Sequence, residues 1–95
     1  MDQSTPVEEL KNLGPKCRDW LEPLKIRTRG DLDAWSFEDL YRAVRTRVPH
    51  CNAVFLYAVA GALLDIGWNE IPPDMKNKLL DIARSVDQEI KKKKR

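Results

Sequence analysis

Residues 53–64, AVFLYAVAGALL, form the stretch around which the rest of this 95-residue chain must be organised. None of the twelve residues is charged, and the hydroxyl of Tyr57 is the only polar side-chain atom among them. A helix that is apolar on every side is buried, and twelve residues are too few to span a bilayer, which takes about 20. The stretch therefore predicts a central helix wrapped by the other segments. Gly61 costs about 1 kcal/mol relative to Ala in mid-helix, which indicates a close packing contact there.

Shorter helices are expected on both sides of this stretch, because apolar residues recur at helical spacing and capping residues precede them. Their expected starts are Val7, Pro15, Thr28, Ser36 and Pro73, and the central helix is expected to start after Asn52 and to end at or just before Gly67. Trp68 and Ile71 should fold back onto the core. No strand pattern occurs. The chain is therefore predicted to be all-α, a compact bundle of five to six helices with a buried central helix, in a single domain over residues 1–90.

The formal charge of +2 is unevenly distributed along the chain. Residues 11–50 carry nine Lys or Arg against six Asp or Glu, and residues 51–90 carry three against six. Residues 91–95 are all basic, whereas the part of the chain before them is net negative. Any nucleic-acid surface on the folded part must therefore be local. The basic tail, 91–95, is expected to be a solvated, disordered end; the alternative is that it adds sequence-independent affinity for phosphate at low salt.

The chain contains two cysteines, Cys17 and Cys51, one histidine, His50, and neither a signal-peptide pattern nor a membrane-spanning run. This composition predicts a cytoplasmic protein with free, buried thiols. One histidine and two cysteines do not complete a four-ligand zinc site, and sequence neighbours are poorly placed to act as a Cys–His dyad. Core or cap positions are expected for both His50 and Cys51. Since no glycine-rich phosphate loop or other catalytic signature occurs, the sequence predicts no enzyme, no metal and no cofactor.

The turn at residues 12–16, NLGPK, lies between two short predicted helices and is close to a helix-hairpin-helix. In that motif a tight turn exposes backbone N–H groups to phosphate, and a glycine such as Gly14 leaves room that a Cβ would fill. Residues 11–29 carry six bases against two acids. The candidate nucleic-acid contacts are Asn12, Gly14, Lys16, Arg18, Arg42 and Arg45. The alternative is that the turn only connects two core helices and that the arginines lie on a solvated helix face.

A longer series of residues points to a family. The residues of this series are Asn12-Leu13-Gly14-Pro15, Trp20-Leu21, Ile26, Thr28 and Asp31-Leu32, followed by Tyr41-Arg42, Asn52, Leu56-Tyr57-Ala58, Gly61-Ala62-Leu63, Trp68-Asn69 and Pro72. With these residues in this order, the chain resembles the C-terminal domain of the TfoX (Sxy) family of competence regulators from about Leu10 to Leu80. The resemblance implies an all-helical domain related to helix-hairpin-helix (SAM-like) folds, in bacterial regulators that switch on DNA-uptake genes with the cyclic-AMP receptor protein.

Three features of the chain depart from the family pattern. The N-terminal domain usual in the family is missing from the sequence, so a stand-alone domain or a fragment of a longer regulator is expected. Lys25 stands where a glycine is common, and Asn12 replaces the first glycine of a Gly-x-Gly hairpin.

Two functions remain open at this point. The first is a regulatory, DNA-associated module that takes part in transcription regulation and contacts the phosphate backbone through the turn and the arginines. The second is a protein-binding adaptor without direct DNA binding, in which the same surfaces contact a transcription factor, a polymerase subunit or a second copy of the chain. Salt separates the two, because binding through several phosphates weakens steeply as salt rises. Neither function involves a membrane.

Overall fold

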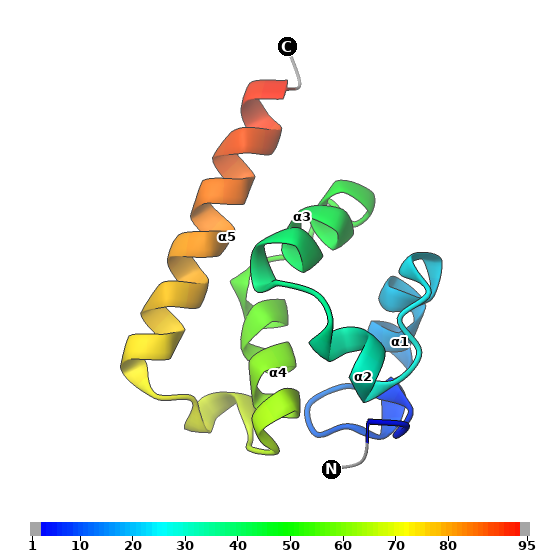
Figure 1. Ribbon diagram of the computed structural model, residues 1–95. Helices are drawn as coiled ribbons and strands as arrows, with labels where there is room; N and C mark the ends of the chain where they lie inside the picture. The colour runs from blue at the N-terminus through cyan, green and yellow to red at the C-terminus, as the bar shows by residue number, and fades with distance from the viewer. Residues whose placement is uncertain (1–2, 94–95) are drawn as a thin grey trace.

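The computed structural model describes residues 3–93, and within that range the chain forms helices, turns and a single isolated bridge (Figure 1). The elements in chain order are η1 (Val7–Glu9), α1 (Pro15–Leu21), η2 (Glu22–Leu24), α2 (Arg29–Asp33), α3 (Phe37–Arg47), α4 (Ala53–Leu64), η3 (Trp68–Glu70) and α5 (Pro73–Lys93). The η elements are single 3-10 turns. The predicted all-α bundle, with helices at the expected places, is therefore confirmed.

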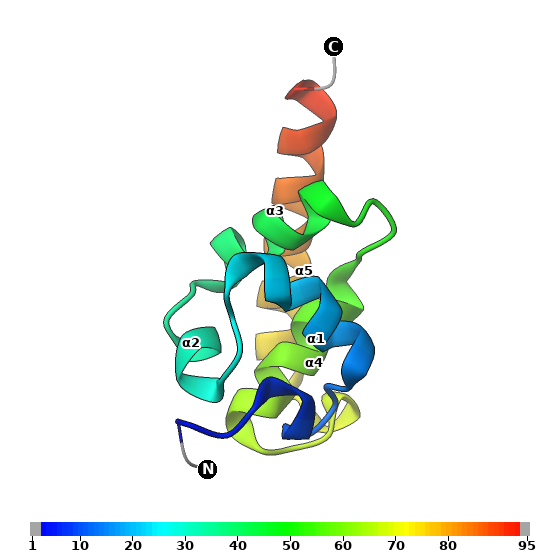
Figure 2. The same cartoon turned by 90° about the vertical axis from the view of Figure 1, so that its right-hand side faces the viewer.

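Helix α4 lies in the middle of the molecule. In Figures 1 and 2 it runs between α5 on one side and α1 and α2 on the other. Its buried residues are Phe55, Leu56, Tyr57, Val59, Ala60, Gly61 and Ala62. Burial is not complete, however, because Val54 and Leu64 are 50% and 49% exposed. The expectation that every face would be covered is wrong at these two positions, since a small domain has too little chain to surround its central helix.

The N-terminal ends of the helices form as their capping residues predict. In α2, the hydroxyl of Thr28 accepts from the N–H of Asp31 at 3.2 Å, and the Asp31 carboxylate accepts from the N–H of Thr28 at 3.3 Å. Ser36 and Asn52 accept in the same way from N–H groups in the first turns of α3 and α4. Each such bond satisfies a donor that has no partner inside the helix.

The C-terminal end of α4 differs from the expected one. The helix stops at Leu64, and Asp65, not Gly67, takes the left-handed conformation with φ 59°. Gly67 has φ −66°, so the glycine is not required there for a left-handed backbone. A Cβ on Gly67 would lie 2.8 Å from the side-chain oxygens of Asn69 and Glu70, which are the ends of side chains that can move.

The N-terminal segment pairs with the chain just before α2. The N–H of Val7 donates to the carbonyl of Arg27 at 3.0 Å, and the N–H of Arg29 donates to the carbonyl of Thr5 at 2.9 Å. The guanidinium of Arg29 then reaches α4, where Nη2 donates to the Leu63 carbonyl at 2.7 Å. A positive charge near the last carbonyls of a helix stabilises that helix, so Arg29 ties α2 to the end of α4.

Helix α5 packs along α3 and α4, and its last turns project beyond the rest of the molecule (Figures 1 and 2). It buries Leu79, Ala83 and Val86, and Ile71 before it is buried as expected. The helix continues to Lys93, which is three residues into the segment 91–95 that was expected to be a disordered tail. Residues 94–95 lie outside the described part, and a solvated, disordered tail over 91–95 stays a prediction.

Candidate functional site

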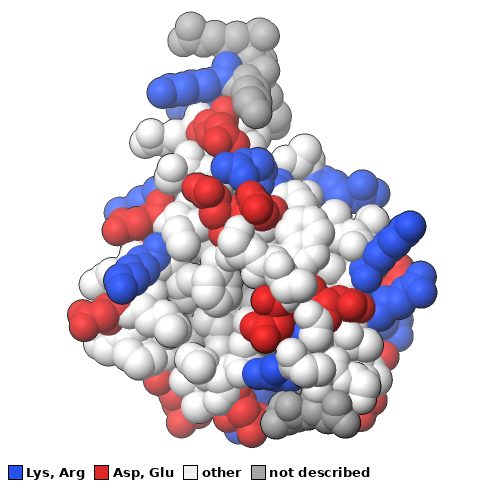
Figure 3. Space-filling view, in the orientation of Figure 1, with Lys and Arg blue, Asp and Glu red and all other residues white. Residues whose placement is uncertain are grey.

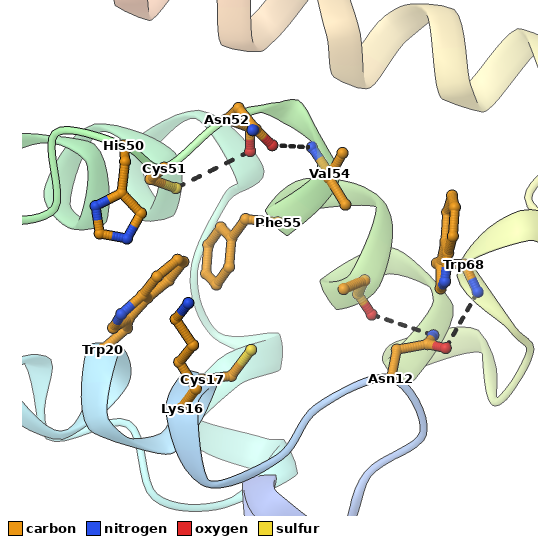
Figure 4. Close-up of a pocket in the computed structure, with 11 residues that line it drawn as sticks. Asn12, Lys16, Cys17, Trp20, His50, Cys51, Asn52, Val54, Phe55 and Trp68 are labelled. Carbon is orange, nitrogen blue, oxygen red and sulfur yellow. Dashed lines mark hydrogen bonds between the residues drawn. The ribbon is translucent and has the colours of Figure 1, made fainter.

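Asn12, the first of the candidate nucleic-acid contacts, is committed to contacts inside the protein. Its φ is 72°, in the left-handed region that Asn tolerates better than most residues. Its Nδ2 donates to the Ile66 carbonyl at 2.9 Å. The same Nδ2 lies 3.4 Å from the carbonyl of Ala58, and its Oδ1 accepts from the N–H of Trp68 at 3.1 Å (Figure 4). Asn12 thus joins the turn to the end of α4 and the start of η3.

The other residues of the turn lie nearer to solvent. Gly14 is extended, with φ −146° and ψ −166°, and a Cβ there would have nothing within 4 Å. Lys16 is exposed, and its Nζ lies 5.6 Å from the centre of the Trp20 ring, which is a cation–π contact. Arg18 is paired with Asp19 at 3.6 Å on the surface. Of these residues, Lys16 presents a charge with no carboxylate partner among residues 3–93.

Arg42 and Arg45 face α5 instead of the turn. Arg42 Nε lies 2.6 Å from Glu89 Oε2, and Arg42 Nη1 lies 2.9 Å from Asp39 Oδ1. Arg45 Nε lies 3.2 Å from Asp87 Oδ1. The structure therefore does not bring these two arginines together with the turn, and it supplies each of them with a carboxylate. Partly exposed pairs of this kind contribute at most about 1 kcal/mol each, so their clearest effect is to orient α5 on α3.

Basic and acidic side chains also lie close together elsewhere on the surface. On the face drawn in Figure 3, Lys and Arg side chains alternate with Asp and Glu, and no broad area is basic alone. Arg27 is paired with Glu22 at 3.3 Å. Within residues 3–93, no carboxylate lies within ion-pair distance of Lys11, Lys16 or Lys25. The basic stretch at residues 11–29 thus leaves three lysines as its free cations.

A groove that the sequence did not predict lies beside α4, next to the turn. We call it the α4 groove; its volume is about 450 Å³ (Figure 4). Helix α1 contributes Lys16, Cys17 and Trp20, the α3–α4 loop contributes His50, Cys51 and Asn52, α4 contributes Val54, Phe55 and Ala58, and Asn12 and Trp68 close the other end.

Aromatic side chains gather at one end of the α4 groove. The ring of Trp20 lies 5.5 Å from that of His50, edge to face, and 5.8 Å from that of Phe55. His50 is exposed in the loop before α4, so the core or cap position expected for it is wrong. The imidazole meets the Trp20 ring at the edge of the groove and stays exposed to solvent there.

The other end of the α4 groove holds a second difference from expectation. Trp68 does not fold onto the core, and 46% of its surface is exposed. Its backbone N–H is held by Asn12, which places η3 along the rim of the groove and leaves the indole above it (Figure 4). With Val54 half-exposed nearby in the lining, the groove offers an apolar surface to solvent.

Both thiols line the α4 groove and are free, as predicted, but only Cys51 is fully buried; Cys17 is half-buried. Burial raises the pKa of Cys51 to about 12 and also raises the pKa of Cys17. A raised pKa keeps the thiol protonated and a poor nucleophile at neutral pH. Burial thus favours the protonated thiol at both positions, and Cys51 is a packing residue of the core.

The raised pKa of Cys51 predicts a loss of stability at high pH. Because the pKa is higher in the folded state than in the unfolded chain, the stabilising contribution is complete below pH of about 9 and is lost as pH rises towards 12. Between pH 8 and pH 10.5, the free energy of unfolding should fall by about 2 kcal/mol more in the native chain than in Cys51→Ala. Urea unfolding at the two pH values measures this, and equal losses in both proteins would contradict it.

The part of the chain that the structure describes holds no group of three or more His, Cys, Asp or Glu side chains arranged for a metal ion. Within the same residues, no helix is both long and apolar enough to cross a membrane.

Comparison with known proteins identifies the family. The sequence matches the model of the TfoX C-terminal domain over residues 3–83. The structure is similar to the crystal structure of an uncharacterized protein from Listeria monocytogenes in a triclinic form, with a TM-score of 0.80 and 22% identity, covering 87% of this chain and 94% of that one. At that identity the likeness shows the fold alone. No curated protein gives a significant match. Because the family match spans most of the sequence, this chain belongs to the TfoX C-terminal domain family.

Proposed function

We propose that this domain is a non-enzymatic regulatory module and that its principal partner is a protein bound in the α4 groove. The observation that carries the proposal is the apolar floor of the groove, where Val54 and Trp68 are each about half-exposed. Exposed apolar surface of this kind marks interaction sites, and aromatic side chains dominate the energy of protein interfaces. Membership of the family favours regulation of DNA-uptake genes as the process, and a transcription factor or a polymerase subunit as the partner.

Direct contact with DNA is the second candidate, and one observation favours it. Lys11 and Lys16 flank the turn at Gly14, and among the described residues neither has a carboxylate partner. The backbone at Gly14 is open, since a Cβ there would meet nothing within 4 Å. Against this, Asn12 is committed inside the protein, and Arg42 and Arg45 are paired with carboxylates. Two lysines would release few counterions, so binding through them would be weak at moderate salt.

A site-specific photo-crosslinking experiment tests the proposed function. The photoreactive residue p-benzoylphenylalanine replaces Val54 in one variant and Leu64 in another, and the whole chain is expressed in its native host. Both positions lie on α4 and are equally exposed, but only Val54 lines the groove. We expect a discrete protein adduct from position 54 and none from position 64. No adduct at position 54, or the same adduct at both, would contradict the proposal.

A titration with duplex DNA decides on the second candidate. It compares the native chain with Lys11→Glu/Lys16→Glu and with Lys78→Glu, which changes an exposed lysine of α5. If binding persists at moderate salt and is lost only in the double variant, the turn is a phosphate site and DNA becomes the principal partner. If binding is absent or insensitive to the double variant, direct recognition at the turn is excluded.

A further inference from the structure

The polar side chains around the α4 groove include no carboxylate. None of the residues that line it, in the described part of the chain, is Asp or Glu. Lys16 stands at the rim with its ammonium held over the Trp20 ring. Asn52 uses its Oδ1 to accept from the N–H of Val54, which leaves its Nδ2 as a donor. His50 is exposed beside Trp20. The rim therefore offers donors and positive charge to a ligand, and the complement of such a rim is a carboxylate.

The walls of the groove also restrict the backbone form of a ligand. Its sides are α1 and α4, whose backbone groups beyond the first-turn N–H groups are bonded within their own helices, and the described residues contain no strand edge. An extended segment gains affinity by pairing with such an edge, so it would leave its own N–H and C=O groups unpaired in this groove. A helix satisfies its backbone internally and presents apolar side chains along one face.

The part of α4 that faces the groove is long enough to receive two side chains of a partner helix that are one helical turn apart. Val54 and Ala58 are four residues apart, which places them about 6 Å from each other along α4. Phe55 and Trp20 lie at one end of this surface and Trp68 at the other. Two apolar side chains at positions i and i+4 of a partner helix would span the same length.

We propose, resting on the proposed function, that the occupant of the α4 groove is an acidic amphipathic helix of a partner protein. Its two apolar side chains lie over Val54 and Ala58, and a carboxylate on the next position around the helix meets Lys16. A second copy of this chain is a poorer occupant, because its large exposed apolar residues in the described part are Val54, Leu64 and Trp68, and these do not form the apolar face of a helix free to insert.

The probe for this proposal is a capped synthetic helical peptide of about four turns. It carries Leu and Phe at i and i+4 and Glu at i+3 and i+7; a second peptide has Gln for each Glu, and a third has Lys. Binding is followed by NMR through the indole N–H signals of the full chain. Trp20 and Trp68 line the groove and should shift, whereas Trp35 lies outside it and serves as an internal control. The expected Kd of the Glu peptide is about 100 µM.

Two pairs of variants test the contacts separately. Lys16→Glu should weaken the Glu peptide about tenfold and should strengthen the Lys peptide, while Lys78→Glu should change neither. Val54→Gln should weaken the Glu peptide about fivefold, and Leu64→Gln, equally exposed on the same helix, should leave it unchanged. Lys16→Glu combined with the Lys peptide is informative because it reverses both charges of the proposed contact and should restore the attraction.

Several outcomes would overturn the inference. Equal affinity for the Glu and Gln peptides removes the acidic partner, and equal effects of Val54→Gln and Leu64→Gln remove the groove. If no peptide binds, or if the Trp35 signal shifts as much as those of the groove, the inference also fails. An adduct at position 54 in cells together with failure of the peptides would leave the proposed function standing and reject only the acidic helix. Failure of both experiments rejects both.

Discussion

Replacing Asn12 by Ala is expected to lower the free energy of unfolding by about 3 kcal/mol. The change removes the donor to the Ile66 carbonyl and the acceptor for the N–H of Trp68. A part-buried group that loses its hydrogen-bond partner costs about 1 kcal/mol or more. Ala also pays about 1 to 2 kcal/mol at the left-handed φ of 72° that Asn12 adopts. Urea unfolding followed by circular dichroism measures the difference.

Asn12→Gly separates the two causes of this loss. Glycine adopts a left-handed backbone without strain but makes neither side-chain hydrogen bond. It should therefore lose about 1 kcal/mol less than Asn12→Ala. Equal stability of Asn12→Ala and the native chain would show that the contacts of Asn12 do not hold in solution.

The second large effect is expected at Gly61, where Gly61→Ala should destabilise the protein by about 2 kcal/mol. Alanine normally stabilises a helix interior by about 1 kcal/mol relative to glycine, so the sign is reversed. The cause is a lack of space: a Cβ on Gly61 would contact Asn12 Nδ2 and lie 2.7 Å from the Ile66 carbonyl oxygen. Overpacking of this kind costs about 1 to 3 kcal/mol. Thermal and urea unfolding measure the change.

Gly14→Ala is the matched control for Gly61→Ala. It makes the same chemical change where a Cβ meets nothing within 4 Å and where the backbone is extended, so its stability should stay within about 0.5 kcal/mol of the native chain. The double variant Asn12→Ala/Gly61→Ala should lose less than the sum of its parts, because the two residues are in contact. Strict additivity, or a stabilising Gly61→Ala, would contradict the packing argument.

Much of the fold could be predicted because the relevant signals are local. The central helix begins at Ala53 as predicted, although it ends at Leu64 and not next to Gly67, and Thr28, Ser36 and Asn52 cap the helices that they precede. The packing contact indicated by Gly61 is also confirmed. Its partner could not be predicted, since Asn12 is far away in sequence and nothing in the chain near either residue specifies that they meet.

The candidate site was harder to predict for the same reason. The roles considered for Arg42 and Arg45 were phosphate contact or a solvated face, but the structure pairs them with Glu89 and Asp87, more than forty residues later. The α4 groove depends on where α1 and η3 stop, and no periodicity encodes an uncovered part of a helix. Lys16 is the predicted cationic contact that has no carboxylate partner among the described residues, and it lies at the rim of that groove.

The amide of Asn12 has a consequence for the motions of the domain. A side chain near the start of the chain holds both the carbonyl that follows α4 and the first N–H of η3. Local opening in proteins proceeds in cooperative units whose members share hydrogen bonds and packing. The turn before α1 and the connection between α4 and α5 therefore belong to one such unit, although more than fifty residues separate them. Whatever loosens the turn at Asn12 also frees Trp68, so the shape of the groove and the order of that turn change together.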